Sequence, residues 1–525
     1  MPKVLISDEM SPKAAEIFRA RGVAVDEKPG LSKDALKAVI GGYDGLAIRS
    51  ATKVTADVLA AARNLKVIGR AGIGVDNVDI PAASAKGVVV MNTPFGNSIT
   101  TAEHAIAMML ALARDIPQAD ASTQAGKWEK SRFMGVELYG KTLGIIGCGN
   151  IGSIVAERAL GLKMKVVAYD PFLTPDRAID LGVEKVDLDT LFQRADFISL
   201  HTPLTDATRN IIDKAALAKM RKGVRIINCA RGGLIDEAAL KAALESGHVA
   251  GAALDVFAEE PARQNPLFGT RGLVATPHLG AATEEAQVNV AIQVAEQLSD
   301  YLLTGAVVNA LNMPSLSAED APKVRPYLRL AELLGSFAGQ ITQSAVKCVR
   351  IEYDGAVTEL NTRPITAAAL TGLLRPLLDS VNMVNAPFIA KERDIDVAEV
   401  KHERESDYHT LVRLTVETEH QTRSVAGTLF ANAAPRLVDI HGIRVEAELG
   451  KHVLYVTNED KPGFIGDLGT LLGEAGINIA TFNLGREQEG ATALALMNVD
   501  SAVPPAVLKE VAKLPHVRQV KALSF

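Results

Sequence analysis

Three polar side chains follow three apolar segments in the middle of the chain, and their types suit acid/base chemistry on a hydroxy acid. Arg231 comes after RIINCA, Glu260 after AALDVFAE, and His278 after LVATP. Oxidising a 2-hydroxy acid requires a base for the hydroxyl proton and a cation for the carboxylate. His278 and Arg231 fit these two roles, and Glu260 fits as the carboxylate that stabilises the imidazolium. Each residue alone is more often structural, so the hypothesis depends on the convergence of all three.

A glycine-rich segment upstream, GIIGCGNIGSIVAERAL, is typical of a dinucleotide-binding turn. Gly147 allows a tight turn, Gly149 lets the backbone approach a pyrophosphate, and Gly152 lets the following helix pack closely. Asp170 ends the next apolar segment, KVVAYD, where a carboxylate meets the ribose hydroxyls of the adenosine. This carboxylate favours NAD over NADP because it would repel a 2′-phosphate. An aspartate that closes a turn before Pro171 is the structural alternative.

These residues need a parallel sheet that brings its strand ends together. Residues 143–278 alternate apolar segments (LGIIG, KVVAYD, FISLHTP, RIINCAR, GAALDVF and LVATPH) with helical ones, which predicts a doubly wound, Rossmann-type α/β sheet. The carboxyl ends of its strands meet at one crevice, where we expect the polar residues and the glycine turn. Residues 4–97 show a second, smaller α/β pattern. An apolar helix over residues 100–114, capped by a threonine, is predicted to connect the two domains, and a helix over 284–301 to return to the first.

The pattern changes after residue 318. Helical segments mix with alternating strands up to about residue 450, without a glycine-rich turn, which predicts an α+β domain. The last segment reads strand, helix, strand, strand, helix, strand, which is the ferredoxin-like arrangement. We therefore predict a substrate-binding domain, a nucleotide-binding domain inserted into it, an intervening domain and a terminal domain. Their residues are 1–98 with 285–315, 99–284, 316–451 and 452–525, respectively.

The composition is that of a soluble globular chain of 525 residues. The net charge of −6 comes from interspersed acids and bases, so neither nucleic acid nor a membrane is an expected partner. The first ten residues, MPKVLISDEM, lack the apolar run of a secretory signal, and no later stretch is long enough to span a membrane, so a cytoplasmic protein is expected. The three cysteines lack CxxC spacing, so neither a disulfide framework nor a metal is predicted.

Several long motifs resemble the D-isomer-specific 2-hydroxyacid dehydrogenases. They are GIIGCGNIG, NCARGGLIDEAALKAAL, GAALDVFAEEP and TPHLGAAT, and their order and spacing fit across residues 1–310. The resemblance implies that Arg231, Glu260 and His278 are catalytic, that NAD is the cofactor, and that the substrate-binding domain is flavodoxin-like. The implied cofactor contacts are Gly147, Gly149, Asn150, Ile151, Gly152, Asp170, Thr202, Cys229, Ala230, Arg231, Asp255, His278 and Gly280.

Further segments resemble the branch of that family that acts on 3-phosphoglycerate: IRSATKVT, GRAGIGVDNVD, MNTPFGNSITTAEHAIAMMLALAR and GKWEKSRFMGVEL. VNAPFIAKERDI and an ACT-like end resemble its long form, which carries an intervening domain. The resemblance implies NAD-dependent oxidation of 3-phospho-D-glycerate to 3-phosphohydroxypyruvate, the first step of L-serine biosynthesis. The arginines suit this substrate because a guanidinium binds phosphate or carboxylate with paired donors. The implied substrate contacts are Arg49, Ser50, Arg70, Asn97 and Ser98.

The ACT-like segment points to regulation. Asn458, Asp460 and Asn478 stand where related domains hold a serine effector, and an oligomerisation module without a ligand is the alternative. Trp128 resembles a residue that reaches the active site of a neighbouring subunit, which favours a homodimer or homotetramer. His104, inside the apolar connecting helix, is expected to serve packing.

Two other functions remain open from the sequence. A reductase for glyoxylate or hydroxypyruvate would use the same three polar residues. A dehydrogenase-like, NAD-sensing binding protein, such as a transcriptional corepressor, would keep the fold without fast turnover. The long tail and the two arginines weigh against the reductase, and a turnover assay separates an enzyme from a sensor.

Overall fold

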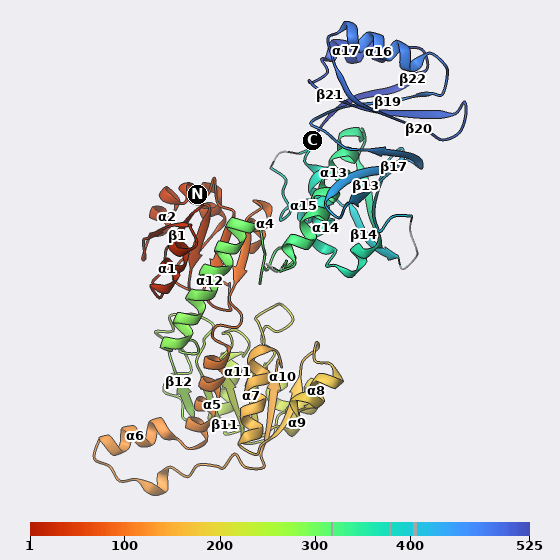
Figure 1. The fold of residues 1–525 in the computed structure, drawn as a ribbon. Helices are drawn as coiled ribbons and strands as arrows, with labels where there is room; N and C mark the ends of the chain where they lie inside the picture. Colours follow the sequence, from red (N-terminus) through yellow and green to blue (C-terminus); the bar gives the residue numbers. More distant parts are fainter. Residues whose placement is uncertain (317–318, 379, 403–406) are drawn as a thin grey trace.

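The computed structural model describes residues 1–316, 319–378, 380–402 and 407–525 (Figure 1). The start of the predicted intervening domain, at residue 316, adjoins residues 317–318, which lie outside the described residues. Within the described part, the strands form four sheets that follow one another along the chain. The fold class predicted from the sequence is confirmed.

The first sheet is parallel, with the order β2-β1-β3-β4-β5 of flavodoxin-like folds. Its central strands are short and apolar because both of their faces are covered. The strands are β1 (Lys3–Ile6), β2 (Ala24–Glu27), β3 (Gly45–Ile48), β4 (Val67–Arg70) and β5 (Val89–Asn92). The helices between them are α1 (Lys13–Ala20), α2 (Lys33–Val39), α3 (Ala56–Ala61) and α4 (Ile80–Ala85).

A helix from much later in the chain completes this domain. The hydroxyl of Thr283 accepts from the amide of Ala286 and begins α12 (Glu284–Thr304). Val294 and Leu298 of α12 lie in the same core as the first sheet. A side chain at Gly69 of β4 would collide with both, so this glycine permits the close approach. Helix α12 therefore packs against the first sheet.

The second sheet is also parallel, with the order β12-β11-β10-β9-β6-β7-β8 of a doubly wound sheet. Its strands are β6 (Thr142–Ile146), β7 (Lys165–Tyr169), β8 (Glu184–Lys185), β9 (Phe197–Leu200), β10 (Val224–Asn228), β11 (Val249–Leu254) and β12 (Leu273–Ala275). Its helices are α5 (Ser98–Ala113), α6 (Ile116–Gln124), α7 (Asn150–Gly161), α8 (Pro175–Leu181), α9 (Leu188–Arg194), α10 (Lys214–Lys219) and α11 (Glu237–Glu245).

The connecting helix α5 begins two residues before the predicted start, and the predicted threonine cap is wrong. Asn97 occupies the cap position but makes no side-chain capping bond. Thr100, the predicted cap, therefore lies inside the first turn, where its hydroxyl is 3.4 Å from that of Thr283. The hydroxyl of the next residue, Thr101, donates to the carbonyls of Asn97 and Gly280. Thr101 thus ties the helix to a loop of the second sheet, a contact that local sequence does not reveal.

A projecting segment follows α5. In Figure 1, α6 and the loop after it extend away from the second sheet as an arm. The side chain of Trp128 in this arm is 86% exposed. An exposed tryptophan on an arm suits contact with another molecule.

The remaining chain forms two further sheets. The third is mixed, with the order β14-β13-β15-β16-β17-β18, and the fourth is antiparallel, with the ferredoxin-like order β20-β21-β19-β22. The third sheet is built from β13 (Val346–Gly355), β14 (Asp396–His402), β15 (Thr410–Thr418), β16 (Thr422–Phe430), β17 (Ala434–Ile440) and β18 (Ile443–Ala447) and lies with α13 (Ala321–Ile341), α14 (Arg363–Leu374) and α15 (Ala386–Glu392). The fourth holds β19 (His452–Glu459), β20 (Ile479–Arg486), β21 (Thr492–Val499), β22 (Val517–Ser524), α16 (Phe464–Glu474) and α17 (Pro505–Val511).

Among the described residues, none of the helices combines the length and the apolar character needed to cross a membrane.

Candidate active site

The three polar residues singled out in the sequence follow three adjacent parallel strands. Strands β10, β11 and β12 are neighbours in the sheet, and Asn228 pairs with Leu254, which pairs with Ala275. Arg231, Glu260 and His278 come after these strands, at the carboxyl edge. The position is the one where parallel sheets place their ligands.

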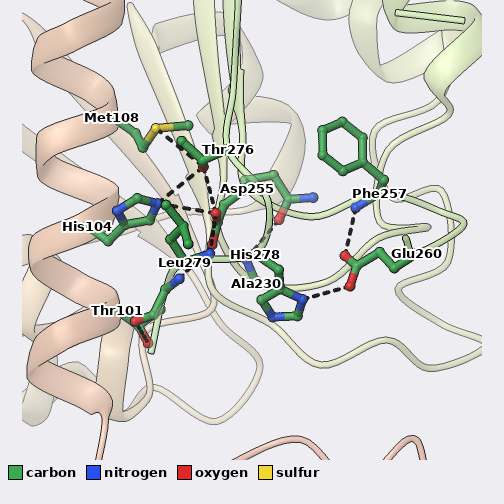
Figure 2. Close-up of polar contacts among 12 residues, drawn as sticks. Thr101, His104, Met108, Ala230, Asp255, Phe257, Glu260, Thr276, His278 and Leu279 are labelled. Atoms are coloured by element: carbon green, nitrogen blue, oxygen red, sulfur yellow. Dashed lines mark hydrogen bonds and ion pairs between the residues drawn. The ribbon is translucent and has the colours of Figure 1, made fainter. Parts of the chain in front are cut away.

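His278 and Glu260 form a directly bonded pair (Figure 2). Nδ1 of His278 lies 2.7 Å from Oε2 of Glu260, while Oε1 of Glu260 accepts from the amide of Phe257 at 3.1 Å. Burial alone would raise the pKa of Glu260, but the bonds from His278 and Phe257 outweigh it and hold this pKa below its ordinary value. The pair is half-open to solvent, with side-chain exposures of 50% and 36%. Because Glu260 engages Nδ1, the Nε2 atom is the one that can face a substrate.

The backbone turn that carries His278 is fixed by hydrogen bonds to the buried carboxylate of Asp255. His278 itself has a positive φ of 57°. The amides of Leu279 and Gly280 donate to the two carboxylate oxygens of Asp255 at 2.7 and 2.8 Å, and the hydroxyl of Thr276 donates at 2.6 Å. Burial would raise the pKa of Asp255, yet these bonds and His104 lower it below the ordinary value, so the carboxylate stays charged. Asp255 is fully buried, so its predicted contact with the nicotinamide stays a prediction.

His104 of α5 does more than the packing we expected. Its Nε2 lies 3.3 Å from Oδ1 of Asp255 and 3.3 Å from the hydroxyl of Thr276. The expectation failed because the partners are more than 150 residues away in sequence and meet His104 only when α5 packs on the second sheet. His104 therefore belongs to the polar support beneath the His278 turn.

The support also includes a thiol. The ligand atoms of His104, Cys229 and Asp255 lie within 4.8 Å of one another. Burial and the charge of Asp255 raise the pKa of Cys229, so its thiol stays protonated and is a poor metal ligand. The oxygens of Asp255 are already engaged by four donors. This chemistry favours a hydrogen-bonded support rather than a metal site.

Two arginines, Arg70 and Arg231, from the first and second sheets, both lie against the GRAGIG segment. Burial, followed by the charge of Arg231, lowers the pKa of Arg70 to about 10. Arg70 is therefore still charged at neutral pH. Side chains at Gly72 and Gly74 would collide with the guanidinium groups of Arg70 and Arg231, so the GRAGIG segment makes room for both. Nε of Arg70 is buried and has no partner in the described residues. Two close cations with an unsatisfied donor suit an anionic substrate.

Asp76 is the acid that sequence reasoning missed here. Its Oδ2 accepts from Nε of Arg231 at 3.1 Å, and its side chain is 70% exposed. This contact joins the first domain to the second across the crevice. The GVDNVD segment directly after GRAGI could have drawn attention to it, because a carboxylate beside two arginines orients them.

The other predicted substrate contacts lie around the same edge of the first sheet. The amide of Arg49 donates to Asp8 at 2.6 Å, its Nη1 donates to the carbonyl of Glu9 at 3.3 Å, and Ser50 is exposed. Asn97 is buried, and its Oδ1 has no partner in the described part of the chain. The hydroxyl of Ser98 donates to the carbonyl of Pro94, which engages it internally. Arg49 and Asn97 therefore retain groups that can bind a ligand.

The glycine turn has the shape that a dinucleotide needs. Gly147 has a φ of +91°, and a side chain there would strike the backbone of His201. A side chain at Gly152 would strike the carbonyl of Gly147, whereas at Gly149 it would meet nothing within 4 Å. Gly149 thus opens onto free space at the start of α7, which includes Asn150 and Ile151. This turn fits a pyrophosphate against the helix N-terminus.

Asp170 lies beside that turn. Its Oδ2 accepts from the amide of Cys148 at 2.8 Å, and its Oδ1 accepts from the amide of Phe172 at 2.8 Å. These bonds fix the carboxylate at the end of β7, next to the glycine turn, as a ribose-binding acid requires. The residues present therefore fit NAD.

The remaining predicted cofactor contacts follow β9 and β10. Thr202 comes shortly after β9, and Cys229 and Ala230 come directly after β10. Asn228, which the sequence did not single out, shapes this turn: its side chain accepts from the amide of Ala230 and donates to the carbonyl of Arg231. A buried asparagine at a strand end is the signal that could have identified it.

The predicted effector residues lie in the fourth sheet. Asn458 is buried near the end of β19 and its Oδ1 has no partner among the described residues. Asp460 binds Arg486 at 3.0 Å, and Asn478 donates to Asp500 at 2.7 Å. Asn458 is therefore the one with a free acceptor, while the other two are engaged within the domain.

Family comparisons agree with this site. The NAD binding domain of D-isomer specific 2-hydroxyacid dehydrogenases matches residues 106–280. The D-3-phosphoglycerate dehydrogenase intervening domain matches residues 323–441, and the ACT domain matches residues 452–516. The cofactor of the matched domain is the one that the glycine turn fits.

Full-length relatives are similarly consistent. The chain is 44% identical to D-3-phosphoglycerate dehydrogenase of Synechocystis sp., covering 99% of this chain and 94% of that protein. It is 42% identical to D-3-phosphoglycerate dehydrogenase of Bacillus subtilis, with both chains covered completely. Among solved structures, the TT0316 protein from Thermus thermophilus is similar with a TM-score of 0.55 and 35% identity, over 59% of this chain and 99% of that one. The chain therefore belongs to the D-3-phosphoglycerate dehydrogenases, within the D-isomer specific 2-hydroxyacid dehydrogenase family.

Proposed function

We propose that this chain oxidises 3-phospho-D-glycerate to 3-phosphohydroxypyruvate with NAD, the first step of L-serine biosynthesis. The observation that carries the proposal is that Arg70 and Arg231 both lie against the GRAGIG segment, and that Arg231 follows the same sheet edge as the His278–Glu260 pair. A substrate with a carboxylate at one end and a phosphate at the other would meet cations at both ends. The relatives that are similar over the whole chain bear the name of this activity.

The residues divide the reaction among them as follows. Arg231 binds the substrate carboxylate, and Arg70 with Arg49 binds the phosphate. Nε2 of His278 takes the proton of the C2 hydroxyl, and Glu260 stabilises the imidazolium that results. When bound, NAD supplies the acceptor for the hydride that leaves C2. In the reverse direction the protonated His278 returns its proton to the keto oxygen.

The support under the turn has a positioning role in this scheme. Asp255 fixes the amides that follow His278, and Thr101 fixes the carbonyl of Gly280 from α5. A base that is held in one orientation is more effective, because less conformational entropy is lost on reaching the transition state. The buried Asp255 and Thr101 therefore help to keep the exposed His278 in position.

The domain division predicted from the sequence, the cofactor contacts and the assembly are also part of this proposal. Trp128 on the exposed arm supports a homodimer or homotetramer. The free acceptor of Asn458 supports a serine effector in the ACT domain. Cys148, Cys229 and Cys348 are all free thiols, which supports a cytoplasmic place of action.

The test is NADH formation with 3-phosphoglycerate, D-glycerate and D-lactate. We expect a clear preference for the phosphorylated acid. Replacing Arg70 by Ala should raise KM for 3-phosphoglycerate about tenfold or more and leave D-glycerate much less affected, because one charge-assisted contact is lost. Equal rates on all three acids would contradict the arginine argument, and no turnover on any of them would favour a sensor.

A further inference from the structure

A second cavity lies far from the active site, between the first domain and α13–α14. Its volume is about 850 Å³. One wall comes from the loops before β4 and β5 and the last turn of α12, and the other from α13, α14 and the loop before α15. Nothing in the reaction described above uses this cavity.

Specific contacts hold its two walls together. Nδ2 of Asn382 donates to the carbonyl of Gly87 at 3.1 Å, and Nη2 of Arg325 donates to the carbonyl of Thr304 at 2.8 Å. A side chain at Gly87 would collide with Asn382, so the turn is shaped for this contact. Val384 lies in the core of the first domain. The two walls of the cavity are therefore joined by specific contacts, and we call it the junction cavity.

The lining carries an excess of positive charge. Its charged residues are Arg63, Lys66, Lys86, Arg325 and Arg375, against Asp44 and Glu332. Lys66 pairs with Asp44 at 3.0 Å, and Arg375 pairs with Glu332 at 2.6 Å. The other three cations have no carboxylate partner in the described ranges. A local excess of this size on a chain with a net charge of −6 attracts anions.

The three unpaired cations are exposed, and two of them are anchored by backbone carbonyls rather than by acids. Lys86 donates to the carbonyl of Ala60 at 3.0 Å, and burial lowers its pKa. Arg325 donates to a carbonyl as well, so neither charge is neutralised by its protein partner. A cation held in this way gains from an anionic ligand.

Apolar side chains also line the cavity, together with a few uncharged polar ones. The apolar side chains include Leu65, Leu302, Met313, Leu316, Leu328 and Val381. Cavities that combine an apolar surface with a few charged groups bind small organic molecules. We propose that this junction cavity binds a small organic anion carrying phosphate or carboxylate groups, through Arg63, Lys86 and Arg325.

This site is distinct from the substrate site. Arg63 and Lys66 precede β4, whereas Arg70 ends it, so the cavity lies at the opposite edge of the first sheet. Helix α12 begins shortly after the His278 turn and its last turn reaches the cavity. At 1.5 Å per residue the helix separates the two sites by about 30 Å.

The test measures binding of pyrophosphate and of citrate to the full-length chain by calorimetry, with NAD at saturating concentration so that the glycine turn is not open to pyrophosphate. The double variant Arg49→Ala with Arg70→Ala removes the two cations that we assign to the substrate phosphate and should still bind one of the two probes. The triple variant Arg63→Ala, Lys86→Ala and Arg325→Ala should lose at least tenfold in affinity. A matched triple variant, Lys141→Ala, Lys165→Ala and Lys222→Ala, removes three exposed cations elsewhere and should bind as the parent does.

Each outcome decides the proposal. Pyrophosphate binding alone assigns a phosphate ligand, and citrate binding alone assigns a carboxylate ligand. If neither probe binds, if the first triple variant binds as well as the parent, or if the double variant abolishes all binding, the proposal is wrong. Should that triple variant fail to fold, Arg63→Glu replaces it, because Arg63 is exposed; a loss of fivefold or more supports the site and unchanged affinity refutes it.

Discussion

The two sides of the His278 turn differ in almost every physical property. On the outer side, His278 and Glu260 form one short bond and are 50% and 36% exposed. On the inner side, the side chain of Asp255 is 0% exposed and accepts from two amides, a hydroxyl and His104. The groups that would exchange protons are thus in contact with solvent, while the groups that fix the backbone are sealed from it.

This difference teaches how precision and reactivity are separated. A base must reach its substrate and change charge, so it cannot be locked in a network. A buried carboxylate with all its acceptors filled is costly to disturb and therefore holds one geometry. We expect changes on the outer side to alter rate without altering stability, and changes on the inner side to alter both.

The largest expected effect comes from the outer side. Replacing His278 by Asn should lower kcat by about a hundredfold or more, because the base is lost. The melting temperature should barely change, since the side chain is half-exposed. NADH formation and thermal unfolding measure the two quantities. His420→Asn, which alters an exposed histidine in the turn between β15 and β16, is the control and should change neither. Normal turnover in the His278 variant would remove His278 from the mechanism.

An inner-side change should affect both quantities. Replacing Asp255 by Asn places an NH₂ group against the amides of Leu279 or Gly280, where two donors face one another. We expect a loss of about 1–3 kcal/mol in the free energy of unfolding. We also expect kcat to fall about tenfold, because the His278 turn shifts. A variant that lost activity but kept full stability in denaturant titration would contradict the division between the two sides.

The same carboxylate predicts an acid dependence of stability. The folded pKa of Asp255 is below its ordinary value of 3.8, so ionised Asp255 stabilises the fold above that pH. This contribution is lost as pH falls below 3.8 and through the folded pKa. The Asp255→Asn variant should be less stable at neutral pH but should lose less between neutral and acid pH. Unfolding measured at several pH values checks this, and parallel curves for the two proteins would contradict it.

The pairing on the outer side could be predicted from sequence, whereas Asp255 on the inner side was named only as a cofactor contact and its supporting role was not predicted. Glu260, His278 and the glycine turn lie within short motifs, each at the end of an apolar segment that predicts a strand. His104 and Asp255 are joined only through the packing of α5 on the second sheet, and Arg70 meets Arg231 only across two domains. The predicted helix cap failed because α5 begins at Ser98, which leaves Thr100 inside the first turn. Local patterns identify residues with chemistry, whereas support between distant segments depends on tertiary structure.

The smallest expected effect tests how much the inner side depends on the contact between His104 and Asp255. His104 contributes one contact of 3.3 Å to Asp255, which keeps three shorter bonds without it. Leu is similar in size and suits the apolar helix, so His104→Leu should cost no more than about 1 kcal/mol of stability. The value of kcat should stay within about twofold, because the amides of the turn remain bound. Thermal unfolding and NADH formation measure both effects, with Thr101→Val as a comparison that removes the other bond from α5. A loss of activity as large as that of Asp255→Asn would mean that His104, rather than the two amides, sets the orientation of the carboxylate.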